Sequence, residues 1–362
     1  MFAYALRGSA ALIGAMLIAA PAAAYTPPKF IIGVWLQPSY KLSAWAARGV
    51  NTAVGYETLG GTVSNADWST AAAAAGLAYI RVPGASLSAD ARDPRLLAFL
   101  QADEPEINNT PSVTLASNYA AWKQGAPNVP VVLNVSGGNV LLKWTPQTTY
   151  IDYLHSADWV ANDFYPIAGW GRPDWLTWVG TAVDTLRGWS NGKPQLAFVE
   201  ATSDISPNRS ANSGIVSPAQ FRTMAWDAIV HGVRGIVYFP QGFNGGFKYD
   251  STPANIVTEM TTLNSHLTSI AATLGTAANP AATAVTVTAP LEAGWRTTST
   301  GRLVIVLNPT DQTIKGASIS LGRTTAATAT VAWEGRRATV NAGVITDSFA
   351  PMTAHVYQVT QR

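Results

Sequence analysis

Short apolar runs rich in Val, Ile, Leu and Phe alternate along most of the chain with polar clusters and Ala-rich stretches of helical spacing. This alternation predicts β/α units around a parallel sheet, because short apolar runs are typical of buried strands and longer amphipathic stretches are typical of helices. The predicted strands are Phe30–Gln37, Asn51–Glu57, Leu77–Val82, Leu96–Asp103, Val129–Val135, Trp159–Tyr165, Gln195–Ala201 and Arg234–Pro240. The predicted helices are Ala66–Ala75, Ala116–Gln124, Trp175–Trp189, Pro218–His231 and Ile256–Leu274.

The number of β/α units favours a closed barrel. Phe30 to Leu274 is close to the roughly 250 residues of a typical (β/α)₈ barrel. An open, doubly wound sheet is the alternative, but the glycine-rich phosphate-binding turn that it often carries is missing after the first predicted strand. We therefore expect an α/β fold in which residues 25–275 form a TIM barrel.

The pattern changes after a Gly-, Asn- and Pro-containing segment at residues 275–280. Beyond it, short Thr- and Val-rich runs are separated by turn residues, which predicts antiparallel strands. These strands are Ala284–Thr288, Leu303–Leu307, Ala317–Leu321, Thr328–Trp333, Ala338–Val340 and Ala354–Val359. Residues 281–362 are therefore expected to form a small C-terminal antiparallel β-sandwich.

The amino-terminal residues have the order of a secretory signal peptide. Arg7 precedes the apolar run Ala10–Ala20, and alanines at 22–24 provide small residues for cleavage. The apolar run is shorter than the ~20 residues that a membrane-spanning helix needs. We expect residues 1–24 to be removed and the mature chain to be secreted or periplasmic in a bacterium, without membrane attachment.

Composition excludes several classes of function. The chain has 23 Lys and Arg, 21 Asp and Glu and a formal net charge of +2, without a basic run, which argues against a nucleic-acid partner. It has no cysteine, so disulfides, thiol nucleophiles and zinc–thiolate sites are excluded. The histidines lack metal-ligand spacing, so no metal or cofactor is expected; they are His155, His231, His266 and His355.

Three of the seven glutamates follow predicted strands, namely Glu57, Glu104 and Glu200. In a TIM barrel the carboxyl ends of the strands form the catalytic face. The fourth and seventh strands lie on opposite sides of the barrel, so we expect Glu104 and Glu200 to face each other. Glycosidic cleavage requires such a pair, because one carboxyl protonates the leaving oxygen while the other stabilises or attacks the cationic sugar carbon.

Four segments resemble those of clan A glycoside hydrolases, which are (β/α)₈ enzymes with an acid/base glutamate after the fourth strand and a nucleophilic glutamate at the seventh. The segments are Ala102-Asp103-Glu104-Pro105, Asn162-Asp163-Phe164-Tyr165-Pro166, Phe198-Val199-Glu200-Ala201 and Val237-Tyr238-Phe239-Pro240-Gln241. The resemblance covers roughly residues 30–274. It implies Glu104 as acid/base, Glu200 as nucleophile, Tyr165 as the phenol that steadies the nucleophile, and a retaining reaction.

Two positions depart from the clan pattern. Asp103 stands where clan members commonly have Asn, and it would raise the proton affinity of Glu104 by adding a negative charge beside it. On the eighth strand, Tyr238 and Phe239 stand where the clan often has Trp. Asp163 shares strand parity with Tyr165 and is a reserve acidic group that could tune or replace one of the pair.

Aromatic and polar residues near the predicted strand ends are candidates for sugar contact, because sugars offer apolar faces to rings and hydroxyls to amides and carboxylates. The substrate-binding candidates are Trp35, Gln37, Glu57, Arg81, Asn134, Trp170, Tyr238 and Gln241. The spacing of Trp175 and Trp178 is more typical of a helix packed on the barrel.

The sequence thus predicts a secreted glycoside hydrolase that acts on an oligo- or polysaccharide of neutral or weakly charged type. Structural interpretations of both glutamates stay open, since Glu104 could belong to a helix start and Glu200 could pair with Arg81 or Arg234. The functional alternatives are a catalytically inactive glycan-binding barrel and a transglycosylase.

Overall fold

The computed structural model describes residues 25–56, 63–205, 214–276 and 285–361. Its first part is a closed barrel of parallel strands in sequential order, in which β8 pairs back to β1. The strands are β1 (Ile31–Gln37), β2 (Thr52–Tyr56), β3 (Ala78–Arg81), β4 (Leu96–Leu100), β5 (Val131–Ser136), β6 (Trp159–Asp163), β7 (Gln195–Glu200) and β8 (Gly235–Phe239). The predicted TIM barrel is confirmed. The predicted signal peptide, residues 1–24, lies outside the described residues, as does Glu57.

Alternate residues of the strands fill the barrel interior, because successive side chains of a strand point to opposite faces. The interior set is apolar and includes Ile31, Val54, Ile80, Ala98, Val132, Ala161, Leu196, Phe198 and Val237. Residues of the other parity, such as Ile32 and Tyr79, pack outward against the helices. On β7 this alternation puts Glu200 on the same face as Leu196 and Phe198, at the carboxyl end of the strand.

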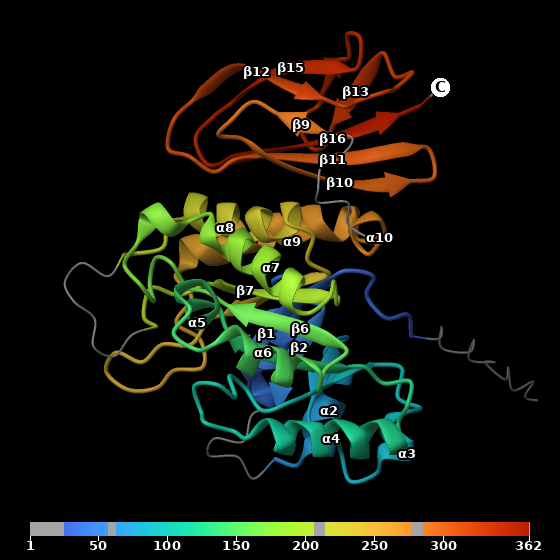
Figure 1. Cartoon of the computed structure of the whole chain (residues 1–362), viewed down its shortest axis with the longest axis vertical. Helices are drawn as coiled ribbons and strands as arrows, with labels where there is room; N and C mark the ends of the chain where they lie inside the picture. The colour runs from blue at the N-terminus through green and yellow to red at the C-terminus, as the bar shows by residue number, and fades with distance from the viewer. Residues whose placement is uncertain (1–24, 57–62, 206–213, 277–284, 362) are drawn as a thin grey trace, which may run out of the picture.

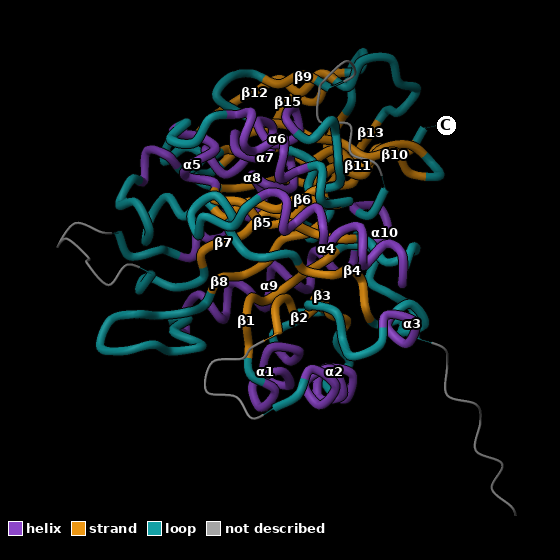
Figure 2. The backbone as a smooth tube through the Cα atoms, turned by 60° about the horizontal axis from the view of Figure 1, so that its bottom comes forward, coloured by secondary structure: helices purple, strands orange, loops and turns teal. Residues whose placement is uncertain are grey.

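The helices lie outside the barrel strands (Figure 2). They are α1 (Leu42–Ala47), α2 (Asn65–Ala74), α3 (Leu87–Asp90), α4 (Ser112–Gly125), α5 (Gly137–Leu142), α6 (Gln147–Leu154), α7 (Trp178–Trp189), α8 (Pro218–Val230), α9 (Ala254–Ser269) and α10 (Ala271–Leu274), with 3-10 turns η1 (Ser39–Lys41) and η2 (Pro173–Trp175). A capping box between Ser217 and Gln220, with Pro218 in the first turn, begins α8. Among the described residues, every helix is too short or too polar to cross a membrane.

The C-terminal part is the predicted β-sandwich, which is confirmed. One sheet has the order β10-β11-β16-β13-β14 and the other the order β15-β12-β9. The strands are β9 (Thr286–Val287), β10 (Glu292–Thr298), β11 (Gly301–Asn308), β12 (Ile314–Ser320), β13 (Thr328–Val331), β14 (Arg336–Thr339), β15 (Val344–Phe349) and β16 (Thr353–Thr360). Alternation along β11 sends Val304 and Val306 into the sandwich core, and sends Leu303 and Ile305 toward the barrel.

The sandwich sits on helix α8, and α8, α9 and α10 lie between it and the barrel strands (Figure 1). Leu303, Ile305 and Val356 of the larger sheet belong to the same apolar cluster as the barrel helices, so the two parts share one core. Arg296 is fully buried at this junction and donates through Nη2 to the carbonyl of Ile229 at 3.1 Å. Its burial lowers the pKa of Arg296 to about 10.

Two strands were absent from the sequence-based prediction, β10 and β15. In β10, Gly294 and several polar residues interrupt the apolar pattern, and the strand is defined by pairing with β11 and by its packing on α8.

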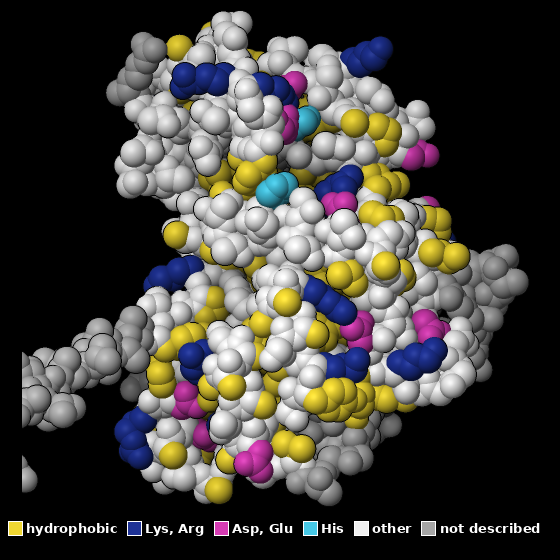
Figure 3. Space-filling model, turned by 180° about the vertical axis from the view of Figure 1, so that it is seen from behind, with side chains coloured by type: hydrophobic (Ala, Val, Ile, Leu, Met, Phe, Trp, Pro, Cys, Tyr) yellow, Lys and Arg dark blue, Asp and Glu magenta, His cyan; other side chains and the backbone are white. Residues whose placement is uncertain are grey.

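Surface charge agrees with the near-neutral composition: over the face in Figure 3, basic and acidic side chains are interspersed across both parts of the molecule.

Close packing at Gly294 predicts a stability effect. A Cβ at this position would lie 2.3 Å from the carbonyl oxygen of Val230, so Gly294→Ala forces β10 or α8 to shift. We expect a loss of about 1–3 kcal/mol, seen as a lower thermal midpoint. The matched control is Gly188→Ala in α7, where a Cβ meets nothing within 4 Å. A gain of about 0.5–1 kcal/mol is expected there, and equal losses in both variants would contradict the packing argument.

Candidate active site

Four carboxylic acids gather at the carboxyl ends of β4 and β6. Asp103, Glu104 and Glu106 lie in the turn that follows β4, and Asp163 is the last residue of β6. The backbone at Glu104 has a positive φ of 40°, and its N–H donates to the carbonyl of Asn134 on β5 at 3.1 Å. The turn is thus held against β5, which brings the acids of the two strands together.

Neighbouring residues of β5 orient this cluster, which we call the β4/β6 acidic cluster. Asn134 donates through Nδ2 to Oδ1 of Asp103 at 2.9 Å. The N–H of Ser136 donates to Oε1 of Glu106 at 2.5 Å, and the hydroxyl of Tyr150 donates to the same oxygen at 3.3 Å. Asp103 and Glu106 are therefore anchored by amide and phenol donors, on either side of Glu104.

The acids raise one another's proton affinity. Burial, followed by the charges of Asp103 and Glu106, raises the pKa of Glu104 to about 7, while hydrogen bonds with Ser136 and Asp163 act in the opposite sense. Burial also raises the pKa of Asp163 well above its ordinary value, and the charge of Glu104 adds to this effect. The cluster therefore retains protons near neutral pH, as a general acid requires.

Glu200 lies in a different environment from Glu104. Its side chain is fully buried, and its two carboxylate oxygens accept hydrogen bonds from the backbone N–H groups of Ile167 at 2.7 Å and Ala168 at 2.8 Å. Glu200 therefore anchors the segment that follows β6, and neither Arg81 nor Arg234 makes the ion pair with it that was one structural interpretation of the sequence.

Tyr165 is electrostatically linked to both glutamates. Burial raises the pKa of its phenol well above the ordinary value, and the charges of Asp163, Glu104, Asp103 and Glu200 all act in the same direction. Its hydroxyl is buried and has no hydrogen-bond partner. The phenol therefore stays protonated, with a free donor among acidic groups.

Trp170 provides an aromatic surface in the segment that follows β6, where its backbone N–H donates to the carbonyl of Tyr165 at 3.0 Å. It is 36% exposed, and its ring centroid lies 5.4 Å from that of Trp144, which is 65% exposed. A Cβ on Gly138 would lie 2.7 Å from Cζ2 of Trp170, so glycine permits this close approach of the indole to the start of α5. Trp175 and Trp178 stack on each other at 4.2 Å and pack against the core, as their spacing indicated.

Trp35, Gln37 and Gln241 form a buried network where β1 and β8 end. Gln37 accepts from the indole of Trp45 at 2.8 Å and donates to the carbonyl of Tyr249 at 2.7 Å. Gln241 donates to the carbonyl of Trp35 at 2.7 Å, and the ring of Trp35 faces Phe198 in the barrel interior. These contacts hold the ends of β1 and β8 together.

Two predicted substrate-binding residues lie on the outer side of the barrel, and for them the prediction was wrong. Arg81 forms an ion pair with Asp90 at 2.8 Å and donates to Ser69 of α2 at 2.8 Å. Tyr238 is fully buried and its hydroxyl donates to Asn264 of α9 at 2.6 Å. Both side chains point outward from their strands, toward the helices. A prediction that misplaces a strand by one residue assigns every side chain of that strand to the wrong face.

Sequence reasoning missed Glu106 and Trp144 as members of this region. Glu106 lies two residues after Glu104, and its acidic neighbours were a signal that could have identified it. Trp144 follows the fifth predicted strand, on the face where the other site residues were expected. Its contact with Trp170 depends on the short helix α5, which the sequence pattern did not predict.

Comparisons with known proteins agree with this architecture. No protein-family model matches the chain, and no curated protein matches it in sequence. Among solved structures, a GH30 endoxylanase from Clostridium papyrosolvens C71 has a TM-score of 0.51 and 13% identity, covering 93% of this chain and 98% of its own. AmyP in complex with maltose has a TM-score of 0.54 and 9% identity, covering 92% of this chain and 95% of its own.

The chain has the fold of (β/α)₈ glycoside hydrolases. A further glycoside hydrolase has a TM-score of 0.54 and 10% identity, and the match covers 92% of each chain. At these identities the likeness establishes the fold alone, so the chemistry has to be argued from the residues of the site.

The raised pKa of Glu104 predicts a pH-dependent stability effect. Its pKa is about 7 in the folded state, against 4.5 in a free side chain, so the folded protein loses stability as pH rises from about 4.5 through 7. Glu104→Gln should remove this loss, so the variant gains stability relative to the native chain over that range. Urea unfolding at pH 4.5 and pH 8 measures the difference. The exposed control Asp311→Asn should give a constant difference, and a constant difference for Glu104→Gln would refute the assignment.

Proposed function

We propose that the protein is a glycoside hydrolase that acts on a neutral or weakly charged glycan, with Glu104 as its proton donor. The observation that carries this proposal is the pKa of Glu104, raised to about 7 by burial and by Asp103 and Glu106 at the carboxyl end of the barrel. A carboxyl with such a pKa can hold a proton for the leaving oxygen near neutral pH. The fold supports the same reaction class.

We propose Glu200 as the second carboxylate. Its two oxygens accept hydrogen bonds from backbone amides, whereas Glu104 lies among other acids, and glycosidases use two carboxyls in different environments for different roles. Direct attack on a sugar, as in a retaining mechanism, requires the backbone at Ile167 and Ala168 to move, because Glu200 has no exposed surface here. Without that movement, Glu200 cannot contact the sugar, and Asp163 is the acidic group that already interacts with Glu104.

Trp170 and Trp144 are the proposed platform for a sugar ring. Their partly exposed rings contact each other in the segments that follow β5 and β6, and aromatic rings bind the apolar faces of sugars. A net charge of +2 provides no strong field that would select a polyanionic glycan. The maltose complex of AmyP, which has the same fold, supports a saccharide ligand. The signal-like residues 1–24 support the proposal that the protein is exported before it acts.

A glycan-binding protein without turnover is the second candidate function. The burial of Glu200 favours it, because both oxygens of this carboxylate are already engaged by backbone amides. In that case the acidic cluster and the tryptophans would hold the sugar, and no bond would be cut.

Sugar release distinguishes the two candidates. The mature chain should release reducing sugar from at least one member of a panel of neutral polysaccharides. Glu104→Gln should lower kcat by about 10²–10⁴-fold, since it removes the general acid, and Glu200→Gln should cause a loss of similar size. Asp163→Asn tests the reserve group, and Asp311→Asn is the control that should keep full activity.

Release that survives both glutamine substitutions would refute the mechanism. Saturable binding to a glycan, measured by calorimetry, with no release by any form would establish the second candidate instead.

The pH profile tests the assignment of Glu104 as the acid. Because the protonated form is active, kcat/KM should fall as pH rises through about 7. Asp103→Asn and Glu106→Gln each remove a charge that raises the pKa of Glu104, so each should move this limb to lower pH. A limb that stays in place in both variants would assign it to another group.

A further inference from the structure

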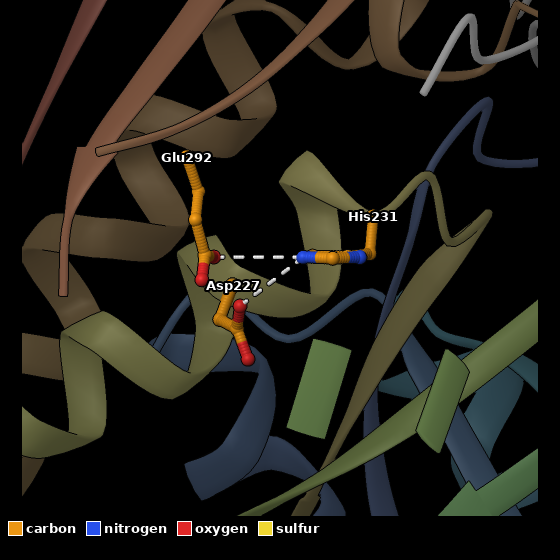
Figure 4. Close-up of side chains that lie close together, drawn as sticks. All are labelled: Asp227, His231 and Glu292. Carbon is orange, nitrogen blue, oxygen red and sulfur yellow. Dashed lines mark ion pairs between the residues drawn. The ribbon is translucent and has the colours of Figure 1, made fainter. Parts of the chain in front are cut away.

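A second cluster of ionisable side chains lies where the barrel meets the sandwich. Asp227 and His231 lie one turn apart at the end of α8, and Glu292 is the first residue of β10 (Figure 4). One ligand atom from each residue, namely Oδ1 of Asp227, Nε2 of His231 and Oε2 of Glu292, lies within 4.8 Å of the other two. We propose that these three atoms bind a divalent transition-metal ion, with Zn²⁺ as the best fit. This proposal is independent of the proposed hydrolase activity.

The spacing of the three atoms fits a tetrahedral ion. Nε2 of His231 lies 3.6 Å from Oδ1 of Asp227 and 3.5 Å from Oε2 of Glu292, too far for hydrogen bonds. Zinc bonds of about 2.0–2.2 Å in a tetrahedral site place neighbouring ligand atoms about 3.3–3.5 Å apart. The two distances from Nε2 therefore already match those of a tetrahedral site, and the ligand atoms of the three residues all lie within 4.8 Å of one another.

Apart from their ion pairs with the single imidazole of His231, the two carboxylate oxygens have no hydrogen-bond partner. The side chain of Asp227 is fully buried, and its Oδ1 has no hydrogen-bond partner, as is also true of Oε2 of Glu292. Two carboxylates that share one imidazole and lack hydrogen bonds at these oxygens are costly to bury, and a bound cation lowers that cost.

The groups behind the ligands are arranged as in metal sites. His231 contacts Oδ2 of Asp184 through Nδ1 at 2.8 Å, which turns Nε2 toward the two carboxylates. Oδ2 of Asp227 accepts from the N–H of Gly180 at 2.6 Å, which leaves Oδ1 for the ion. A carboxylate behind a metal-binding imidazole and a donor behind a metal-binding carboxylate fix the ligand orientation and raise affinity.

The site has access to solvent and a matching donor set. A surface cavity of about 540 Å³ is lined by Asp184, Arg187, His231 and Glu292, among others, so a water can occupy the fourth position of the ion. Arg187 is paired with Asp184 at 3.5 Å and also donates to the carbonyl of His231, so its charge is partly offset. One imidazole and two carboxylates favour Zn²⁺ over Ca²⁺ or Mg²⁺, which prefer all-oxygen sites.

No metal ligand was predicted from the sequence, because the histidines lack the local spacing that is typical of metal ligands. Asp227 and His231 do have the i, i+4 spacing of neighbours on one helix face, which was a usable signal. Glu292 comes from the sandwich, and only the docking of β10 on α8 brings it to them. An ion at this position would bridge the two parts of the molecule.

Calorimetry with Zn²⁺ on the mature chain tests the proposal, using chelator-treated protein without a histidine tag at pH 7.5. We expect one Zn²⁺ per chain and a rise in thermal midpoint on adding Zn²⁺. His231→Gln and Asp227→Asn should each weaken binding by more than about 100-fold, and Asp184→Asn by about 10- to 100-fold. The exposed control His155→Gln should bind like the native chain.

Circular dichroism of each variant separates lost binding from lost folding. If His231→Gln did not fold, Glu292→Gln removes a ligand from the sandwich side and should weaken binding in the same way. The proposal would be overturned if the native chain took up no Zn²⁺, or if uptake survived in His231→Gln, Asp227→Asn and Glu292→Gln. Equal affinity for Ca²⁺ would overturn the choice of a transition metal.

Discussion

The free-energy cost of removing carboxyl groups from water is the constraint on which the functional sites of this protein depend. A barrel with an apolar interior leaves few positions where an acid can be placed without cost, and the strand ends and the junction with the sandwich are two of them. At the carboxyl ends of β4 and β6, burial and then the charges of neighbouring acids raise the pKa values of Glu104 and Asp163, so that protons remain bound near neutral pH. At Glu200, backbone amides provide the compensation instead. The chemistry proposed for the site follows from this difference between two glutamates.

The junction cluster is a third solution to the same problem. Asp227 is as deeply buried as Glu200, but only one of its oxygens has an amide donor. Its other oxygen has no hydrogen-bond partner and forms an ion pair with His231, which also pairs with Glu292, and this is the arrangement that we propose binds a metal ion. The apolar contacts of β11 with the barrel helices hold the sandwich in place and thereby keep Glu292 in the cluster.

Much of the architecture could be predicted from the sequence, because buried parallel strands are continuous apolar runs that any reading of hydrophobicity detects. The positions of Glu104 and Glu200 at strand ends followed from the same pattern. Contacts made by the backbone could not be predicted in this way. The side chains of residues 167 and 168 give no sign that their N–H groups bind Glu200. The orientation of Arg81 and Tyr238 was wrong because strand parity depends on a register of one residue. The third ligand of the junction cluster depends on tertiary docking.

Measurement of the pKa of Glu104 tests most directly whether this carboxyl retains its proton near neutral pH. Carbon-detected NMR of the labelled mature chain can follow the side-chain carboxyl signal through a pH titration, with Glu104→Gln to assign the resonance. We expect a midpoint near 7, because burial and two acidic neighbours oppose the ionisation of Glu104. A midpoint near the ordinary value of 4.5 would contradict this assignment, because Glu104 would then be an anion at neutral pH with no proton to donate.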